Sequence, residues 1–137
     1  MKSTTRLTLA VIATILLAIP SFGQNYRLSS HILDIDAGVP ASGVKITLEK
    51  MNPDSTWSFV DQKTTDENGR VKDFLEEGTD DSNGIYRLTY HVKPYFERKG
   101  IETFYPFIEV AFEISGDKHY HVPITLSPFG YSTYRGN

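Results

Sequence analysis

The stretch His119-Tyr120-His121-Val122-Pro123-Ile124-Thr125-Leu126 decides the fold, because polar and apolar side chains alternate along it with a period of two. Such alternation is typical of a β-strand that has one face in a core and the other toward solvent. The apolar face consists of Tyr120, Val122, Ile124 and Leu126. The imidazoles of His119 and His121 are therefore expected on the outer face of a sheet.

Three other segments alternate in the same way, at residues 44–48, 86–92 and 108–114. Turn-forming residues separate the predicted strands, at 52–55, 66–69, 80–84 and 115–117. Short strands at regular spacing are typical of an antiparallel sandwich. We predict an all-β protein, an antiparallel β-sandwich of about seven to eight strands.

Helix is scarce in this sequence. Residues 95–100 are expected to form a helical turn or two, and residues 73–77 another. Pro94 and Pro106 bracket a connection rich in tyrosine and phenylalanine, which we interpret as a structured loop. No internal repeat or low-complexity tract occurs, so the sequence predicts a single domain. Within that domain we expect one short helix.

The first 23 residues have the layout of a secretory signal peptide. Lys2 and Arg6 precede an apolar run over residues 7–20, and Ser21-Phe22-Gly23 forms a small-x-small cleavage pattern. A retained membrane anchor is the alternative, although the run falls short of the ~20 residues that a spanning helix needs. We expect residues 1–23 to be removed, residues 24–137 to form the domain, and the protein to be exported, periplasmic or secreted.

Charge limits the expected partners, and cysteine content limits the possible sources of stability. Lys2 and Arg6 are the only charged residues of segment 1–23, so its removal takes the formal net charge from −3 to −5. Nucleic acid and anionic lipid both favour clustered basic residues, so we expect neither as a partner after cleavage. The chain has no cysteine, so its stability cannot depend on disulfides.

Several polar residues could support chemistry, although each has an ordinary alternative. The two outer-face histidines titrate near neutral pH and could transfer protons, or they could form a solvated surface pair. A shared metal ion is another possibility for them, but no third ligand is evident at matching spacing. Arg70 follows the turn at 66–69 and could hold a planar or anionic ligand, or simply be solvated.

Motifs spread along the chain resemble those of the 5-hydroxyisourate hydrolases, the enzymatic relatives of transthyretin. The matching segments are Ser29-Ser30-His31-Ile32-Leu33-Asp34, Gly38 to Val44, Thr65 to Arg70, Phe104-Tyr105-Pro106, and His119 to Gly136. They occur in the family's order and cover nearly all of residues 24–137. One departure is Asn137, which stands where the family usually ends in serine.

The resemblance implies a transthyretin-like fold and a set of site residues. It implies that His31, Arg70 and His121 are catalytic. It also implies substrate binding by His31, Arg70, His119, Tyr134, Arg135, Gly136 and Asn137. The implied reaction is hydrolysis of the small molecule 5-hydroxyisourate in urate degradation, with neither a metal nor an organic cofactor. The implied assembly is a homotetramer, a dimer of dimers with sites between the dimers.

Two other functions are compatible with a small sandwich. One is a transthyretin-like protein that binds a small ligand without catalysis. The other is a structural or adhesive module of the cell envelope. Transthyretin differs from the hydrolases at the positions of His31, Arg70 and His121, and the presence of all three residue types here favours the hydrolase.

Overall fold

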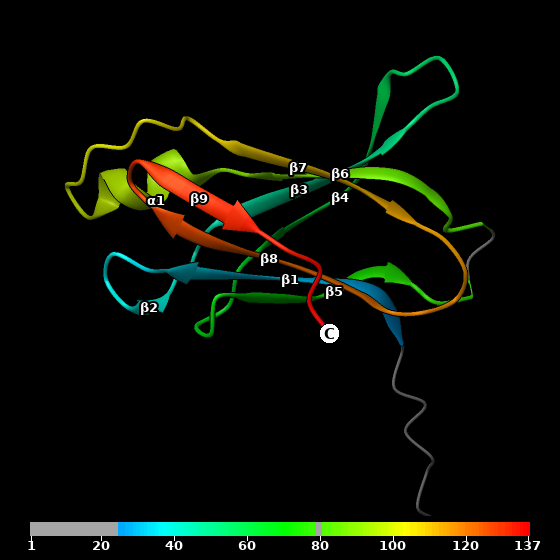
Figure 1. Cartoon of the computed structure of the whole chain (residues 1–137), viewed down its shortest axis with the longest axis horizontal. Coiled ribbons are helices and arrows are strands. Elements are labelled where there is room, and N and C mark those ends of the chain that lie inside the picture. The colour runs from blue at the N-terminus through cyan, green and yellow to red at the C-terminus, as the bar shows by residue number, and fades with distance from the viewer. Residues whose placement is uncertain (1–24, 79–80) are drawn as a thin grey trace, which may run out of the picture.

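A computed structural model describes residues 25–78 and 81–137, which form two β-sheets and one short helix (Figure 1). The predicted signal peptide, residues 1–23, lies outside the described residues. The first sheet contains β1 (Tyr26–Asp34), β2 (Val39–Pro40), β5 (Arg70–Glu76), β8 (Tyr120–Ser127) and β9 (Gly130–Thr133). The second contains β3 (Lys45–Met51), β4 (Trp57–Thr64), β6 (Gly84–Tyr90) and β7 (Ile108–Ile114). The helix is α1 (Val92–Arg98).

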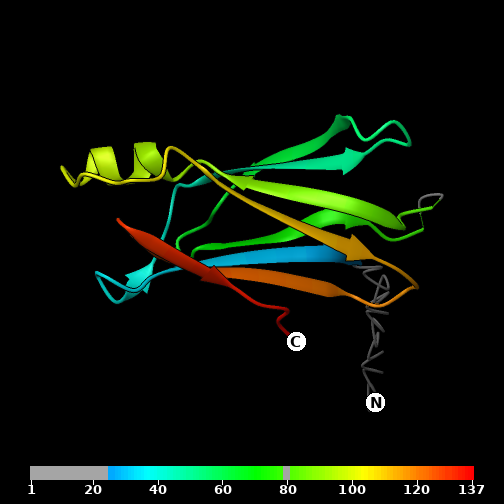
Figure 2. The ribbon, with the colours of Figure 1, turned by 45° about the horizontal axis from the view of Figure 1, so that its top comes forward.

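The two sheets lie as two layers with α1 at one end (Figure 2). The alternating segments supply one inward face each, as the sequence predicts. Residues that are almost entirely buried between the layers include Leu28, Ile32, Leu48, Phe74, Leu88, Ile114, Ile124 and Leu126. Each such side chain stabilises the fold by roughly 1.5–3 kcal/mol. The β-sandwich prediction is confirmed.

One strand pairing departs from the antiparallel prediction. β1 pairs with β5 antiparallel but with β8 parallel, so the first sheet is mixed. Periodicity shows which side chains share a face, whereas it carries no information about the direction in which neighbouring strands run. This parallel pair has the consequence that the start of β1 lies beside the start of β8.

Two further differences concern local structure. The helical turn predicted over residues 73–77 is wrong, because that segment belongs to β5 up to Glu76 and pairs with β1, with Phe74 buried in the core. The other helix begins at Val92, earlier than the predicted residue 95. Pro94 is compatible with this start, since the first turn of a helix needs no backbone N–H donor there.

The structure has nine strands in its described part, compared with the seven to eight predicted. The two-residue β2 and the tail strand β9 are both short. In residues 25–78 and 81–137, no helix is long and apolar enough to cross a membrane.

Candidate active site

Three neighbouring strands bring the predicted catalytic residues to one outer face of the first sheet. β1 lies between β5 and β8, with His31 directly opposite Arg70 on β5. Ser29, two residues earlier on the same face of β1, pairs with His121 on β8. Since paired strands lie roughly 5 Å apart, His31, Arg70 and His121 are all within reach of one small molecule. Segments far apart in the sequence thus converge on one surface.

A tight turn fixes the start of β5 and so the position of Arg70. The Asp66 carboxylate accepts hydrogen bonds from the backbone N–H groups of Asn68 and Arg70, both at 2.9 Å. Gly69 adopts the left-handed conformation, with φ of 70°. Its carbonyl accepts a 2.9 Å bond from the N–H of Ile32 on β1. The turn is therefore tied directly to the strand that carries His31.

Replacing Gly69 with alanine should displace this turn. A Cβ there would lie 2.6 Å from the Ile32 carbonyl oxygen, and the left-handed conformation itself costs a non-glycine residue about 1–2 kcal/mol. Gly38 is a matched control, because its φ is 71° and a Cβ there would meet nothing within 4 Å. In thermal unfolding, we expect Gly69→Ala to lose clearly more stability than Gly38→Ala. Equal losses would show that the close approach to β1 does not matter.

The surroundings of His31 and His121 lower the pKa of both imidazoles. Burial and the positive charge of Arg70 lower the pKa of His31, outweighing a backbone hydrogen bond at Asn68 and the charge of Asp66. Burial, Arg70, His31 and His119 together lower the pKa of His121. Both shifts favour the neutral imidazole, the form in which a histidine can accept a proton.

Ser29 links His121 on β8 with His119, the residue just before that strand, a contact that the sequence interpretation missed. Its Oγ lies 2.8 Å from Nε2 of His119 and 2.8 Å from Nδ1 of His121. Nδ1 of His119 lies 2.7 Å from the carbonyl oxygen of Tyr26. Alternation along β1 places Ser29 on the same face as His31, but only the parallel β1–β8 pairing brings it to the histidines.

The tail contacts His121 through Gly136. After β9 the chain forms an isolated bridge in which the N–H of Gly136 donates to the carbonyl of His121 at 2.9 Å. A Cβ on Gly136 would lie only 2.4 Å from Cδ2 of His121, so the glycine backbone packs against the ring edge. The tail is thus paired with β8 at this point, and a side chain at position 136 would collide with the imidazole.

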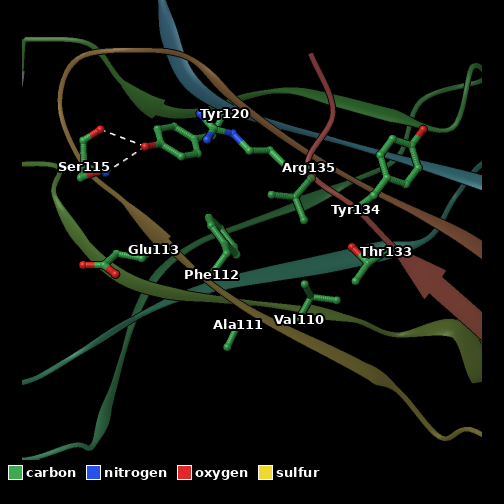
Figure 3. A pocket seen from close by; sticks show the side chains of 10 residues that line it. Val110, Ala111, Phe112, Glu113, Ser115, Tyr120, Thr133, Tyr134 and Arg135 are labelled. Atoms are coloured by element: carbon green, nitrogen blue, oxygen red, sulfur yellow. Dashed lines mark hydrogen bonds between the residues drawn. The ribbon is translucent and has the colours of Figure 1, made fainter.

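Two other tail residues line a pocket that does not include the histidines. Tyr134 and Arg135 line a pocket of about 390 Å³ between β7 and the tail (Figure 3). The Arg135 guanidinium carbon lies 4.7 Å from the centre of the Tyr120 ring, whose hydroxyl bonds to the backbone of Ser115. Tyr120 faces away from the histidine cluster, so these two tail residues are not grouped with it within one chain. Asn137 is exposed at the end of the tail.

His91 lies apart from the cluster. Its Nε2 is 3.0 Å from the Thr47 hydroxyl on the second sheet, and it takes no part in the contacts among His31, His119 and His121. Among residues 25–78 and 81–137, no three histidine, aspartate or glutamate side chains gather as a metal-binding group. The outer face of the first sheet presents the imidazoles of His31, His119 and His121, the guanidinium of Arg70 and the hydroxyl of Ser29.

This geometry defines a class of protein, a two-layered sandwich with an imidazole–guanidinium site on the outside of one sheet. Residues 28–136 match the HIUase/Transthyretin family. A probable 5-hydroxyisourate hydrolase of Caenorhabditis elegans is 43% identical over 129 residues, which cover 93% of this chain and 94% of the relative. The chain belongs to the HIUase/Transthyretin family.

Solved structures show the same fold in proteins with different names. The 5-hydroxyisourate hydrolase of Klebsiella pneumoniae has a TM-score of 0.70 and 33% identity, covering 83% of this chain and 95% of that chain. Sea bream transthyretin, solved in complex with thyroxine, has a TM-score of 0.75 and 29% identity, covering 80% and 94%. A fold shared by a hydrolase and transthyretin does not determine function, so function must be argued from the site.

Proposed function

We propose that the chain hydrolyses 5-hydroxyisourate to 2-oxo-4-hydroxy-4-carboxy-5-ureidoimidazoline in urate degradation. The observation that carries this proposal is the meeting of His31, Arg70 and His121 on one outer face, through the registers of β1 with β5 and β8. The names of the similar hydrolases support the choice of substrate.

The site residues can divide the work of a hydrolysis. One imidazole removes a proton from water, whose oxygen forms a bond to a ring carbonyl carbon. The ring C–N bond then breaks and the leaving nitrogen receives a proton, so that the attacked carbonyl carbon becomes a carboxyl group of the ring-opened product. General acid–base assistance of this kind contributes typically about 10²–10⁴ in rate.

Arg70 supplies the electrostatic part. Its guanidinium is always charged and presents several donors in a planar fork, which suits the oxygen-rich edge of an oxopurine. The same group stabilises the oxyanion that develops when water adds to the carbonyl. Arg70 also lowers the pKa of His31 and His121. It therefore favours the neutral form of the base in addition to binding the substrate.

The pH dependence of kcat/KM should report these lowered pKa values. A base must be neutral to act, and a pKa below the usual 6.5 keeps it neutral to lower pH. We expect the rate to hold through pH 6.5 and to fall only in more acidic solution. Arg70→Gln removes the positive charge and should move this fall to higher pH, whereas Arg70→Lys should leave it nearly in place. A wild-type midpoint above 6.5 would contradict the prediction.

We also propose that the protein assembles as a homotetramer, a dimer of dimers. β7 and β9 are edge strands of their sheets. Exposed aromatic side chains lie near them, namely Phe104, Phe107, Phe129, Tyr131 and Tyr134. Exposed apolar surface of this kind is typical of protein–protein contacts, and subunit contacts would turn an open site into a pocket. Light scattering on the purified protein should give four times the chain mass, and a monomer would contradict the assembly.

Export remains a proposal that rests on residues 1–23 alone. The basic start, apolar run and small-x-small pattern support a signal peptide. Mass spectrometry of the protein from its natural cell compartment should show an N-terminus near residue 24. An intact Met1 on the exported protein would contradict the cleavage.

The ultraviolet decay of 5-hydroxyisourate, generated by urate oxidase, tests the proposed reaction. Purified protein should accelerate the loss of absorbance, and added chelator should leave the rate unchanged. An unaltered decay would favour the alternative of a small-ligand carrier, which resembles the transthyretin solved with thyroxine.

A further inference from the structure

The hydrogen bonds around Ser29 determine where the ring protons of two histidines lie. The carbonyl oxygen of Tyr26 can only accept a hydrogen bond, and it lies 2.7 Å from Nδ1 of His119. Nδ1 of His119 must therefore carry a proton. In the neutral form of this imidazole the other nitrogen is bare, and Nε2 of His119 then accepts a hydrogen bond.

The same reasoning extends through the serine. Ser29 Oγ lies 2.8 Å from Nε2 of His119, and a bare nitrogen at that distance requires the hydroxyl to donate to it. A hydroxyl has one proton, so Ser29 can only accept from its other partner. That partner is Nδ1 of His121, also at 2.8 Å, which must therefore carry a proton.

We propose that Ser29 and His119 act as positioning residues that hold His121 in the Nδ1–H tautomer. This arrangement leaves the lone pair on Nε2 of His121, where it can take a proton from water. A histidine base is commonly set by the bond that its other nitrogen makes. The role assigned to the lone pair rests on the proposed function, whereas the tautomer itself does not.

Two contacts support a fixed ring at His121. The Gly136 backbone packs against its Cδ2 edge, and Ser29 holds Nδ1 from the neighbouring strand. The parallel register of β1 with β8 runs without interruption from Leu28 to Asp34 and aligns Ser29 directly with His121. Sites on strands are held more firmly than sites on loops.

Nitrogen NMR of the imidazoles tests the proposal independently of activity. In ¹⁵N-labelled wild type at neutral pH, we expect the long-range ring spectrum to show Nδ1 of His121 protonated and Nε2 bare. Ser29→Ala removes the bond, and His119→Ala frees the serine to donate to His121, so both should shift the tautomer toward Nε2–H. A wild-type His121 that already carries its proton on Nε2 would overturn the proposal.

Kinetics provides the second readout. Ser29→Ala should lower kcat at least tenfold with little change in KM, and Ser29→Thr, which keeps the hydroxyl, should restore most of it. Ser58→Ala is the control, because Ser58 lies on β4 of the second sheet and its hydroxyl bonds to Asn52 in the turn before that strand. A full kcat in Ser29→Ala would overturn the positioning role. If the NMR result holds and wild type fails to hydrolyse 5-hydroxyisourate, only the proposed function fails.

Discussion

His121→Ala is expected to lower kcat/KM for 5-hydroxyisourate by about 10²- to 10⁴-fold, the range typical of a lost general acid–base group. The lowered pKa of His121 favours the neutral imidazole that a general base requires, and its ring contacts Ser29 and Gly136. Initial rates with freshly generated substrate would measure the loss.

His91→Ala is the matched control for this prediction. His91 is also partly buried with a lowered pKa, but it bonds to Thr47 on the other sheet. We expect its rate to stay within a factor of two or so of wild type. If both alanine variants lost activity equally, or if neither did, His121 would have no special part in the reaction.

Lys99→Met is expected to destabilise the fold by about 2–4 kcal/mol, since it removes one partner of a buried carboxylate. Asp34 is fully buried, and its Oδ2 accepts from Lys99 Nζ at 2.8 Å and from the Tyr95 hydroxyl at 2.7 Å. Burial alone would raise the pKa of Asp34, but hydrogen bonds from Lys99, Ala37 and Tyr95 lower it overall. Without the lysine, a buried charge loses its counter-ion. Denaturant unfolding at pH 7 would measure the difference.

The pH dependence of this loss follows from the sign of the shift. A carboxyl whose folded pKa lies below its unfolded value stabilises the fold above that unfolded value, near 3.8, and loses this contribution as pH falls through the folded pKa. The deficit of Lys99→Met should therefore be largest at neutral pH and shrink in acid. Lys93→Met is the control, because Lys93 is exposed on α1, which ends just before Lys99, and makes a 4.0 Å pair with Glu97. A control that lost as much stability as Lys99→Met would remove Asp34 from the explanation.

The faces of the strands could be predicted from the sequence, as β8 shows. Alternation from His119 to Leu126 predicts the inner positions of Val122, Ile124 and Leu126, which are buried, because the period of a strand is two. The direction of β8 relative to β1 could not be obtained in this way. The helical turn predicted over residues 73–77 is wrong, because a pattern over so few residues does not separate a strand from a helical turn. The segment forms a strand because it pairs with β1.

The site, like the fold, could be predicted only in part from the sequence. The motifs identify His31, Arg70 and His121 as members of one set, but their geometric relation depends on β1 lying between β5 and β8. In the sequence, Ser29 is part of a matching motif but has no assigned role. The parallel register of β1 and β8 shows that it lies opposite His121. Tyr134 and Arg135 remain predicted substrate-binding residues, although within one chain they line a pocket with Tyr120.

A shared active site on the outer face of the first sheet is tested most directly by comparing three single variants with wild type. His31→Ala, Arg70→Ala and His121→Ala should each remain folded and associated like wild type, and each should hydrolyse 5-hydroxyisourate at least tenfold more slowly. The measurement is the single-turnover rate of substrate loss at equal protein concentration. Wild-type rates in all three variants would contradict the account.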